Sequence, residues 1–597
     1  MQQLSDNLFW WIDTCNVYIL RDGDEAILID FGAGDVLDNL HRLGVFRVTD
    51  VLMTHHHRDQ GQGLKRAVEA GAKVWVPAAE RDLFDAVEDY WESRVVWNNY
   101  NTRDDRFTLT ESIPVAGTLP EYRPTRFGGY EVTAIPLPGH TVGSVGLLTQ
   151  VDGRRTAFTG DLISGPGKVW SLAATQWSYA GAEGVAASVL SLLDLQKRRP
   201  DVVLPSHGGP MDDADGAIDP LVERMLRLLG LRGQHADVLE RRDRPYHRLL
   251  PHLLHNWSSH AFSYVLLSDS GKALFMDYGY DMHTGLAAGQ DRASRRPWLY
   301  TIPTLKEQFG VDDIDVVIPT HYHDDHVAGC NLLRQAEGTA VWAGANCNVV
   351  LERPGDHDLP CLWYEPIPVD RVIALGEPVR WEEYELTLHP LPGHAQNAVA
   401  IEVTVDGTRV LVTGDQYAED GELNYVYRNR FRRSDYRVSG NLLMRVQPEL
   451  LLSGHWPPER VGPGYLRDLR DRGAELERLH QALLPIEHTD FDAEGFGAWV
   501  RPYQLDVSAG VPARLQVEVR NPHPVPETIT VTLVGPTGWI SEPPRASVKL
   551  GPGEHGTLSF TVTPQAGTRV RRSRVAADVW VGERHFGQQA EALLTVK

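Results

Sequence analysis

The stretch Thr320-His321-Tyr322-His323-Asp324-Asp325-His326 decides the fold, and it comes directly after a short apolar run, Val316–Ile318. A closely similar stretch, Thr54-His55-His56-His57-Arg58-Asp59-Gln60, stands 266 positions earlier (54 against 320) and also follows an apolar run. Imidazole and carboxylate groups at alternating positions after a strand are what a divalent transition-metal site needs, because a loop lets them converge. The sequence therefore predicts a metal site that occurs twice.

Further motifs repeat in the same order. Pro138-Gly139-His140 matches Pro392-Gly393-His394, Thr159-Gly160-Asp161 matches Thr413-Gly414-Asp415, and Ser206-His207-Gly208 loosely matches Ser453-Gly454-His455. The histidine of the first motif and the aspartate of the second are 21 residues apart in both copies (140 to 161 and 394 to 415). A fixed internal spacing of this kind indicates a tandem duplication.

Short apolar runs alternate with helical stretches in each copy, which favours α/β layers with helices covering the sheets. The polar metal-type residues directly follow apolar strands, where loops at one sheet edge gather ligands on a rigid base. We expect one copy over residues 1–235, a linker over 236–256 and the second copy over 257–490.

The sequence pattern changes after about residue 500, where alternating apolar and polar residues are separated by Pro and Gly turns. This pattern predicts a β-sandwich of the immunoglobulin type over residues 500–597. The segment contains no cluster of metal-type residues, so we expect packing or partner binding there rather than chemistry.

The net charge and composition of the chain disfavour some classes of binding partner. A formal net charge of -22 disfavours nucleic acid, because most of the surface would repel a phosphate backbone. No run of about 18 apolar residues and no signal-peptide pattern is present, so we expect a soluble, cytoplasmic protein with no membrane partner. The four cysteines lack CxxC spacing and are expected to be reduced thiols rather than metal ligands.

These motifs resemble the metallo-β-lactamase superfamily, whose signature is HxHxDH followed by single His, Asp and His ligands that each end a strand. The resemblance covers roughly residues 5 to 485 in two copies, and the second copy matches the core motif of glyoxalase II in full. It implies two tandem four-layer αββα domains, an α/β fold class, followed by the sandwich.

The resemblance also implies the ligands. In the second copy His321, His323 and His394 would bind one ion, Asp325, His326 and His455 another, with Asp415 between them. In the first copy the equivalents are His55, His57 and His140, then Asp59 and His207, with Asp161 between them. Gln60 departs from the pattern, since an amide is a weaker ligand than imidazole. We therefore expect two Zn²⁺ ions in the second copy and one or two in the first, while iron or manganese would accept the same ligands.

The resemblance implies a metal-dependent hydrolase in which a metal-bound hydroxide cleaves an ester, thioester, lactone or related bond of a small molecule, chiefly in the second copy. Asp325 or Asp415 could orient the water or accept its proton. Tyr417, two residues after Asp415, is the best single candidate for a substrate or oxyanion contact, although its segment could equally pack in the core.

Two alternatives stay open from the sequence. The three-histidine site could instead hold a single iron ion and oxidise a sulfur substrate, as persulfide dioxygenases of the same fold do. The first copy could be a non-catalytic binding or dimerisation module. A homodimer is a further possibility.

Overall fold

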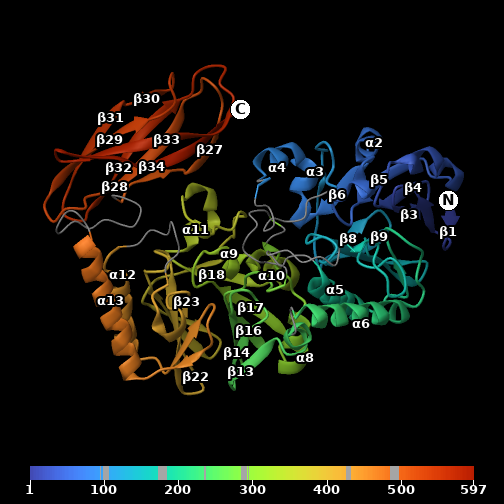
Figure 1. The fold of residues 1–597 in the computed structure, drawn as a ribbon, viewed down its shortest axis with the longest axis horizontal. Helices are drawn as coiled ribbons and strands as arrows, with labels where there is room; N and C mark the ends of the chain where they lie inside the picture. Colours follow the sequence, from blue (N-terminus) through green and yellow to red (C-terminus); the bar gives the residue numbers. More distant parts are fainter. Residues whose placement is uncertain are drawn as a thin grey trace.

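Two α/β units lie next to each other in the computed structural model, and the C-terminal strands lie beside the second unit (Figure 1). The structure describes residues 1–94, 96–97, 107–172, 184–233, 237–283, 292, 295–424, 432–483 and 497–597. The two α/β units are called the first and second copy below.

The first copy contains two sheets. One has seven strands in chain order: β1 (Gln2–Gln3), β2 (Leu8–Ile12), β3 (Asn16–Asp22), β4 (Glu25–Ile29), β5 (Arg47–Leu52), β6 (Lys73–Pro77) and β7 (Gly117–Leu119). The other has the order β12 (Val202–Leu204), β11 (Arg154–Phe158), β10 (Val145–Val151), β9 (Tyr130–Pro136) and β8 (Pro124–Phe127). The helical elements are η1 (Asp35–Leu43), α1 (Arg58–Gly61), α2 (Leu64–Glu69), η2 (Ala78–Glu80), α3 (Asp82–Asp85), α4 (Val87–Ser93), α5 (Val185–Lys197), α6 (Ala214–Arg232) and α7 (Val238–Asp243).

The second copy repeats this arrangement. Its first sheet runs β13 (Tyr246–Leu250), β14 (Leu253–Asn256), β15 (Ser263–Leu267), β16 (Lys272–Met276), β17 (Asp313–Ile318), β18 (Ala340–Gly344) and β19 (Arg371–Ile373). Its second sheet runs β20 (Pro378–Trp381), β21 (Tyr384–Pro390), β22 (Val399–Val405), β23 (Thr408–Gly414), β24 (Leu450–Ser453) and β25 (Glu459–Arg460). The helical elements are α8 (Ile302–Phe309), α9 (Asp324–Val327), α10 (Cys330–Glu337), α11 (Asn348–Glu352), η6 (Pro354–Asp356), η7 (Glu419–Gly421), α12 (Asp435–Val446) and α13 (Pro463–Leu483).

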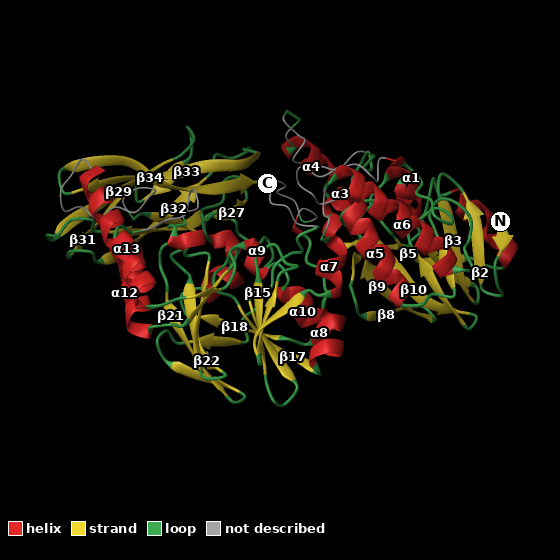
Figure 2. Cartoon of the chain, turned by 60° about the horizontal axis from the view of Figure 1, so that its bottom comes forward, coloured by secondary structure: helices red, strands yellow, loops and turns green. Residues whose placement is uncertain are grey.

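The layers of the first copy form because successive side chains along a strand pack on opposite faces of the sheet. In β3, Val17 and Ile19 pack into a core against the helices, whereas Tyr18 and Leu20 pack into a second core shared with the other sheet. Successive side chains of a strand point to opposite faces, so a strand that is apolar at every position must be covered on both sides. Helices α5 and α6 cover the outer face of the second sheet (Figure 2), which completes four layers.

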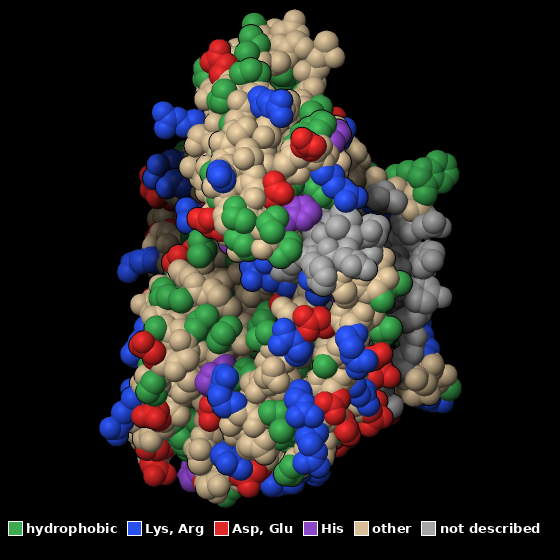
Figure 3. Space-filling model, turned by 90° about the vertical axis from the view of Figure 1, so that its left-hand side faces the viewer, with side chains coloured by type: hydrophobic (Ala, Val, Ile, Leu, Met, Phe, Trp, Pro, Cys, Tyr) green, Lys and Arg blue, Asp and Glu red, His purple; other side chains and the backbone are tan. Residues whose placement is uncertain are grey.

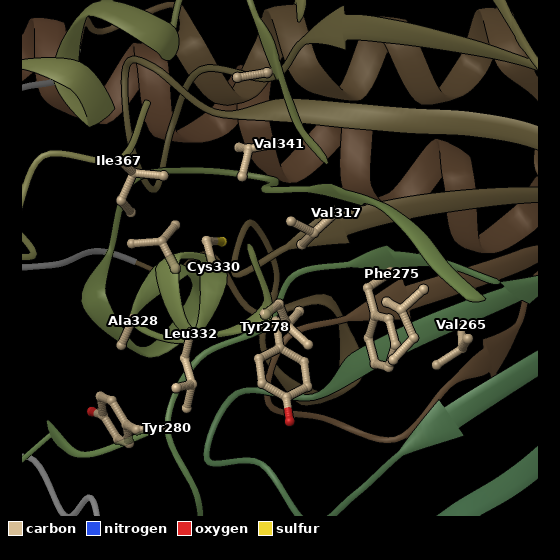
Figure 4. Packing of buried hydrophobic residues seen from close by; sticks show 14 of the residues in the cluster. Val265, Phe275, Tyr278, Tyr280, Val317, Ala328, Cys330, Leu332, Val341 and Ile367 are labelled. Atoms are coloured by element: carbon tan, nitrogen blue, oxygen red, sulfur yellow. The ribbon is translucent and has the colours of Figure 1, made fainter. Parts of the chain in front are cut away.

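The second copy is layered in the same way. In β16, Ala273 and Phe275 face the core under helices α8 to α11, while Leu274 and Met276 face the second sheet. Figure 4 shows the helix-side core, in which Phe275 and Tyr278 lie near Val317 and Cys330. Helices α12 and α13 cover the other face of the second sheet. The duplicated α/β architecture expected from the repeated motifs is confirmed.

The predicted linker over residues 236–256 is wrong. Val238 of α7 is buried in the core of the first copy beneath α5. Strand β14 pairs antiparallel with β15 in the first sheet of the second copy, and β13 pairs antiparallel with β14. The first copy therefore extends to Asp243, and the second copy begins at Tyr246.

The C-terminal segment forms two sheets that share one core. One sheet contains β26 (Trp499–Arg501), β28 (Ala513–Arg520), β32 (His555–Thr563) and β30 (Ile540–Glu542). The other contains β27 (Gln504–Val507), β34 (Arg584–Val596), β33 (Val570–Val581), β29 (Glu527–Val534) and β31 (Arg545–Leu550). Val517 and Phe560 of one sheet pack with Val531 and Val579 of the other.

Basic and acidic side chains alternate over the visible face of the second copy (Figure 3). Cys15, Cys330 and Cys347 are buried free thiols, and Cys361 is an exposed free thiol. Among the helices that the structure describes, none is long and apolar enough to cross a membrane.

Candidate metal centres

All the predicted ligands lie just beyond the carboxyl ends of strands, which is why they meet at one edge of each copy. In the second copy they follow β17, β21, β23 and β24, and in the first copy they follow β5, β9, β11 and β12. Within the described ranges, three groups of His and Asp side chains have ligand atoms within 4.8 Å of one another. Two of these groups are in the second copy and one is in the first.

The first group of the second copy consists of His321, His323, His394 and Asp415. Nε2 of His394 lies 3.1 Å from Nδ1 of His323 and 3.5 Å from Oδ2 of Asp415. Nitrogens bound to one tetrahedral zinc ion lie about 3.3 Å apart, since each Zn–N bond is about 2.0–2.1 Å. The spacing of these donors fits one ion.

The second group consists of Asp325, His326, His455 and again Asp415. Nε2 of His455 lies 3.1 Å from Oδ2 of Asp325 and 3.1 Å from Oδ2 of Asp415. Nε2 of His326 lies 3.2 Å from the other oxygen of Asp415. Asp415 is therefore the residue that the two groups share.

The histidines of the first group are in the protonation state that can bind a cation. Burial lowers the pKa of His321, and burial together with His394 lowers the pKa of His323 to about 3. These rings are neutral at pH 7 and offer lone pairs, and Nε2 of His321 is buried without a hydrogen bond. A divalent ion is the natural partner for such unpaired nitrogens.

The second group is electrostatically different. Burial opposes protonation of His455, but Asp415 and Asp325 outweigh it and raise the pKa to about 10. Asp415, Asp277 and Asp325 likewise raise the pKa of His326 well above its usual value despite burial. Without a metal ion these imidazoles carry the positive charge that the carboxylates require.

Buried acceptors orient the histidines of the second copy. Asp277 accepts hydrogen bonds from the amide and hydroxyl of Thr320 at 2.6 and 2.8 Å, and its Oδ2 lies 2.8 Å from Nδ1 of His326. The Thr320 hydroxyl lies 3.1 Å from Nδ1 of His321, and the carbonyl of Asn424 lies 3.3 Å from Nδ1 of His394. Such contacts fix the ring orientation of metal-binding histidines.

Close packing at the second group requires a glycine. A Cβ atom at Gly454 would lie 2.2 Å from Oδ1 of Asp415 and 2.6 Å from Cε1 of His326. No side chain fits there while both groups are in place. The residue that precedes His455 is therefore constrained by the ligands themselves.

The first copy forms a matching three-histidine group. Nε2 of His140 lies 3.0 Å from Nδ1 of His57 and 3.5 Å from Oδ2 of Asp161. Nε2 of His55 is buried without a hydrogen bond, and burial lowers the pKa of this ring well below its usual value. These residues fit one ion in the same way as their counterparts.

The other half of the first copy is different. Gln60 donates to Oδ2 of Asp161 at 3.2 Å. The ring of His207 lies between two carboxylates, with Nδ1 2.8 Å from Asp161 and Nε2 3.2 Å from Asp59. Burial lowers the pKa of His207, but Asp161 and Asp59 outweigh it and raise it to about 10. An imidazolium ion thus balances the carboxylates here.

A second replacement accompanies Gln60. The amide of Ser206 donates to the carbonyl of Gly160, as the amide of Gly454 does to Gly414, so Ser206 occupies the position of Gly454. The Ser206 hydroxyl donates to Oδ2 of Asp30 at 2.6 Å. Burial raises the pKa of Asp30 to about 7 despite hydrogen bonds from Ser206 and Thr54.

The intervening residues of the two motifs point away from the ligand groups. His56 is fully buried with its Nδ1 3.0 Å from Glu80, and Tyr322 packs in the helix-side core. Tyr417 is buried against Tyr436, with ring centroids 6.0 Å apart. It borders a cavity of about 220 Å³ that Trp456 and Tyr465 also line, and its catalytic role stays a prediction.

Two residues near the second group were not predicted from the sequence. The rings of His260 and Tyr280 stack at 5.3 Å, and the His260 ring lies 5.5 Å from that of His455. In the first copy Trp170 stacks on His207 at 4.2 Å. Tyr280 stands three residues after Asp277, the aspartate that orients His326. This closeness in sequence is the local signal that could have pointed to Tyr280.

Comparison with known proteins gives the following matches. The family model described as the metallo-beta-lactamase superfamily matches residues 10–207 and 284–455. The beta-lactamase-like protein 2 homolog of Drosophila melanogaster is 26% identical over 219 residues, which are 34% of this chain and 62% of that protein. A hydroxyacylglutathione hydrolase of Cereibacter sphaeroides is 34% identical over 99 residues, which are 17% of this chain and 32% of that protein.

Among solved structures, a subclass B3 metallo-beta-lactamase of Bradyrhizobium japonicum is 21% identical. The match covers 40% of this chain and 94% of that one, with a TM-score of 0.30. This chain spans less than two thirds of the length of the two curated relatives above. The two regions matched by the family model make up more than half of the 597 residues, and each contains one of the three-histidine groups. The chain belongs to the metallo-beta-lactamase superfamily.

Proposed function

We propose that the protein is a metal-dependent hydrolase that acts in its second copy on an ester, thioester, lactone or related bond of a small molecule. The observation that carries this proposal is the shared position of Asp415. Its Oδ1 lies 3.2 Å from His326 of one group, and its Oδ2 lies 3.5 Å from His394 of the other. A carboxylate between two ion positions is suited to two-metal hydrolysis.

The proposed ligands are the seven residues identified above. One ion would be held by His321, His323 and His394, the other by Asp325, His326 and His455, and Asp415 would serve both. Ions held there would lower the pKa of a bound water molecule to about 7 and would polarise a carbonyl or phosphoryl oxygen. The neutral rings of His321 and His323 and the ionised carboxylates are donors of the types that bind zinc.

The protein's own groups supply orientation. Although burial raises the pKa of Asp325, His326 and His455 outweigh it and hold the pKa below its usual range. The carboxylate of Asp325 is therefore ionised, and it can orient a water molecule at the site by accepting a hydrogen bond. The ring of His260, which stacks on the buried Tyr280, lies beside His455 and is placed to orient a small substrate.

Two considerations support hydrolysis over the single-iron alternative. A mononuclear oxidoreductase would use the three histidines and leave the group around Asp325 and His455 without a role. The name of the hydroxyacylglutathione hydrolase also supports a hydrolytic reaction, although the match spans 17% of this chain. We assign the first copy a single ion at His55, His57 and His140, and we assign the C-terminal sheets an accessory role as an immunoglobulin-like sandwich.

Metal analysis of the whole protein tests the proposal. We expect about three zinc ions per chain, about one after Asp415→Ala and about two after His55→Ala. The intact protein should hydrolyse at least one ester, thioester or lactone in a screen, and Asp415→Ala should abolish that activity. One iron ion per copy, with oxygen consumed in the presence of a sulfur substrate, would instead favour the oxidoreductase.

A further inference from the structure

The dipeptide Arg295-Arg296 lies at the junction of the two copies and contacts a loop of each. The residues that follow it are anchored in the first copy, since Trp298 and Tyr300 are buried among the side chains of α5 and α6. The amide of Leu299 donates to the hydroxyl of Tyr122 of the first copy at 3.1 Å. The segment is therefore part of the second copy by sequence and part of the first copy by packing.

Arg295 contacts the ligand loop of the second copy. Its guanidinium forms an ion pair with Oδ2 of Asp324, and both side chains are largely buried. The other oxygen of Asp324 accepts a hydrogen bond from the amide of Asp325 at 3.1 Å. Asp324 stands between the predicted ligands His323 and Asp325, so the ion pair restrains the loop that holds them.

Arg296 contacts the ligand loop of the first copy. Its guanidinium donates to the carbonyls of Val142 and Ser144 at 2.6 and 3.0 Å and pairs with Glu121. The side chain is only 2% exposed. Val142 and Ser144 lie two and four residues after His140, so the arginine restrains the loop that carries the third histidine of the first copy.

A buried carboxylate extends this restraint to the other histidines of the first copy. Oε1 of Glu80 accepts from the hydroxyl of Thr141 at 2.6 Å and from the amide of Gly143 at 3.2 Å. The same oxygen lies 3.0 Å from Nδ1 of His56, which stands between His55 and His57. Glu80 thus connects the loop of His55 and His57 with the loop that follows His140. The carbonyls of that second loop accept the hydrogen bonds from Arg296.

We propose that Arg295 and Arg296 couple the two metal centres, so that an ion bound in one copy strengthens ion binding in the other. This inference rests on the metal binding proposed above. An ion fixes the loop that ligates it, and the buried ion pairs pass that restraint to the partner loop, which then loses less conformational freedom when it binds. Coupling of this kind is reciprocal between the two sites.

A second ion pair between the copies provides a matched comparison. Lys197 of α5 lies 2.9 Å from Glu307 of α8. Both side chains are exposed, and neither lies in a ligand loop. Lys197→Met therefore removes a charge contact between the copies without touching the proposed path.

The test is a zinc titration of the full chain against a chromophoric chelator, in three forms. The unchanged chain has both centres, His55→Ala retains only the centres of the second copy, and Asp415→Ala retains only the centre of the first. If the copies are independent, the isotherm of the unchanged chain equals the sum of the other two. We expect the unchanged chain to bind zinc at least about fivefold more tightly than that sum predicts.

The same three forms are then prepared with Arg296→Met, Asp324→Asn or Lys197→Met. We expect Arg296→Met and Asp324→Asn each to restore simple additivity, and Lys197→Met to leave the coupling unchanged. Asp324→Asn retains an acceptor for the amide of Asp325 and leaves the packing of Trp298 intact, so it remains informative if Arg296→Met fails to fold. Additive isotherms in the unchanged chain, or coupling that survives in both variants, would overturn the inference. A chain that binds no zinc in its second copy would instead refute the proposed function.

Discussion

Oδ2 of Asp277 lies 2.8 Å from Nδ1 of His326, whereas Oδ2 of Asp30, its counterpart in the first copy, accepts a hydrogen bond from Ser206 at 2.6 Å. The same buried carboxylate therefore orients a predicted metal ligand in one copy and a hydroxyl in the other. The two copies share a scaffold but differ at the second metal position.

Asp277→Asn should weaken zinc binding at the second group of the second copy by about 10- to 100-fold, because His326 loses the charged acceptor that orients its ring. Competition with a chelator measures the change. Asp406→Asn is the control, since Asp406 pairs with His252 at 2.7 Å in the exposed turn before β23, at the other end of that strand from Asp415. Equal effects of the two substitutions would contradict the orienting role.

Gln60→His alone should add little metal to the first copy, whereas Gln60→His combined with Ser206→Gly should add about one zinc ion per chain. The reason is steric, because a Cβ atom at the equivalent Gly454 would lie 2.6 Å from His326. Elemental analysis of both variants checks this. A full extra ion in the single variant would show that Ser206 does not restrict the site.

The two ions of the second copy should bind with different pH dependence. His321 and His323 have lowered pKa values and are already neutral at pH 7, so binding there should release almost no protons. His455 has a pKa of about 10, and the pKa of His326 is also raised, so binding at the second group must displace protons. Its affinity should rise by about one to two orders of magnitude per pH unit between pH 6.5 and 10.

Calorimetry in two buffers of different ionisation enthalpy measures this proton release. The first, tighter ion should give the same heat in both buffers, and the second should not. Buffer-independent heats for both ions would contradict the charge assignment of His455.

The metal-free first copy should lose stability as the pH rises from about 4 to 7. Asp30 keeps its proton up to a pKa of about 7 in the folded state, whereas the unfolded carboxyl loses it near the ordinary value of 3.8. Over this window the unfolded state binds fewer protons, so rising pH favours unfolding by up to about 4 kcal/mol. Asp30→Asn should remove this slope, which thermal unfolding in the presence of a chelator measures. Parallel pH profiles for both proteins would refute the raised pKa.

His260→Ala should raise the KM for a hydrolysed substrate about tenfold while leaving the zinc content unchanged, because the ring is placed beside the second group without being one of its ligands. His247→Ala is the control, since that exposed ring stacks on Trp257 at 4.9 Å instead. A loss of zinc in His260→Ala would show that His260 is itself a ligand.

The predicted ligands could be read from the sequence because each follows the strand that positions it. The ends of β17 and β23, for example, fix His321 and Asp415 locally. The orientation of rings could not be read in this way. His207 turns Nδ1 toward Asp161, whereas His455 presents Nε2 to Asp415. The partner that each ring faces is distant in sequence, since Asp161 and His207 are 46 residues apart.

The predicted boundary between the copies was wrong for a related reason. Residues 246–256 contain three histidines and a proline and lack a clear alternating pattern, so they resemble a linker. Their strand conformation comes from sheet pairing, in which β14 pairs with β15 and β13 pairs with β14. Arg295 and Arg296 likewise look like surface charges, and only contacts with distant loops reveal that they are buried. Long-range contacts of this kind leave no local signal.

Because β13 and β14 belong to the first sheet of the second copy, they determine where the chain can be truncated to obtain that copy alone. A fragment that starts at residue 257 would lose both strands and leave β15 as the edge of its sheet. All five residues of β15 are buried in the intact chain, so this edge would be largely apolar and unprotected. Exposed edges of that type pair with other chains and aggregate. A fragment that begins shortly before Tyr246 keeps the edge covered, and truncation at that point is the one expected to yield a monomeric second copy.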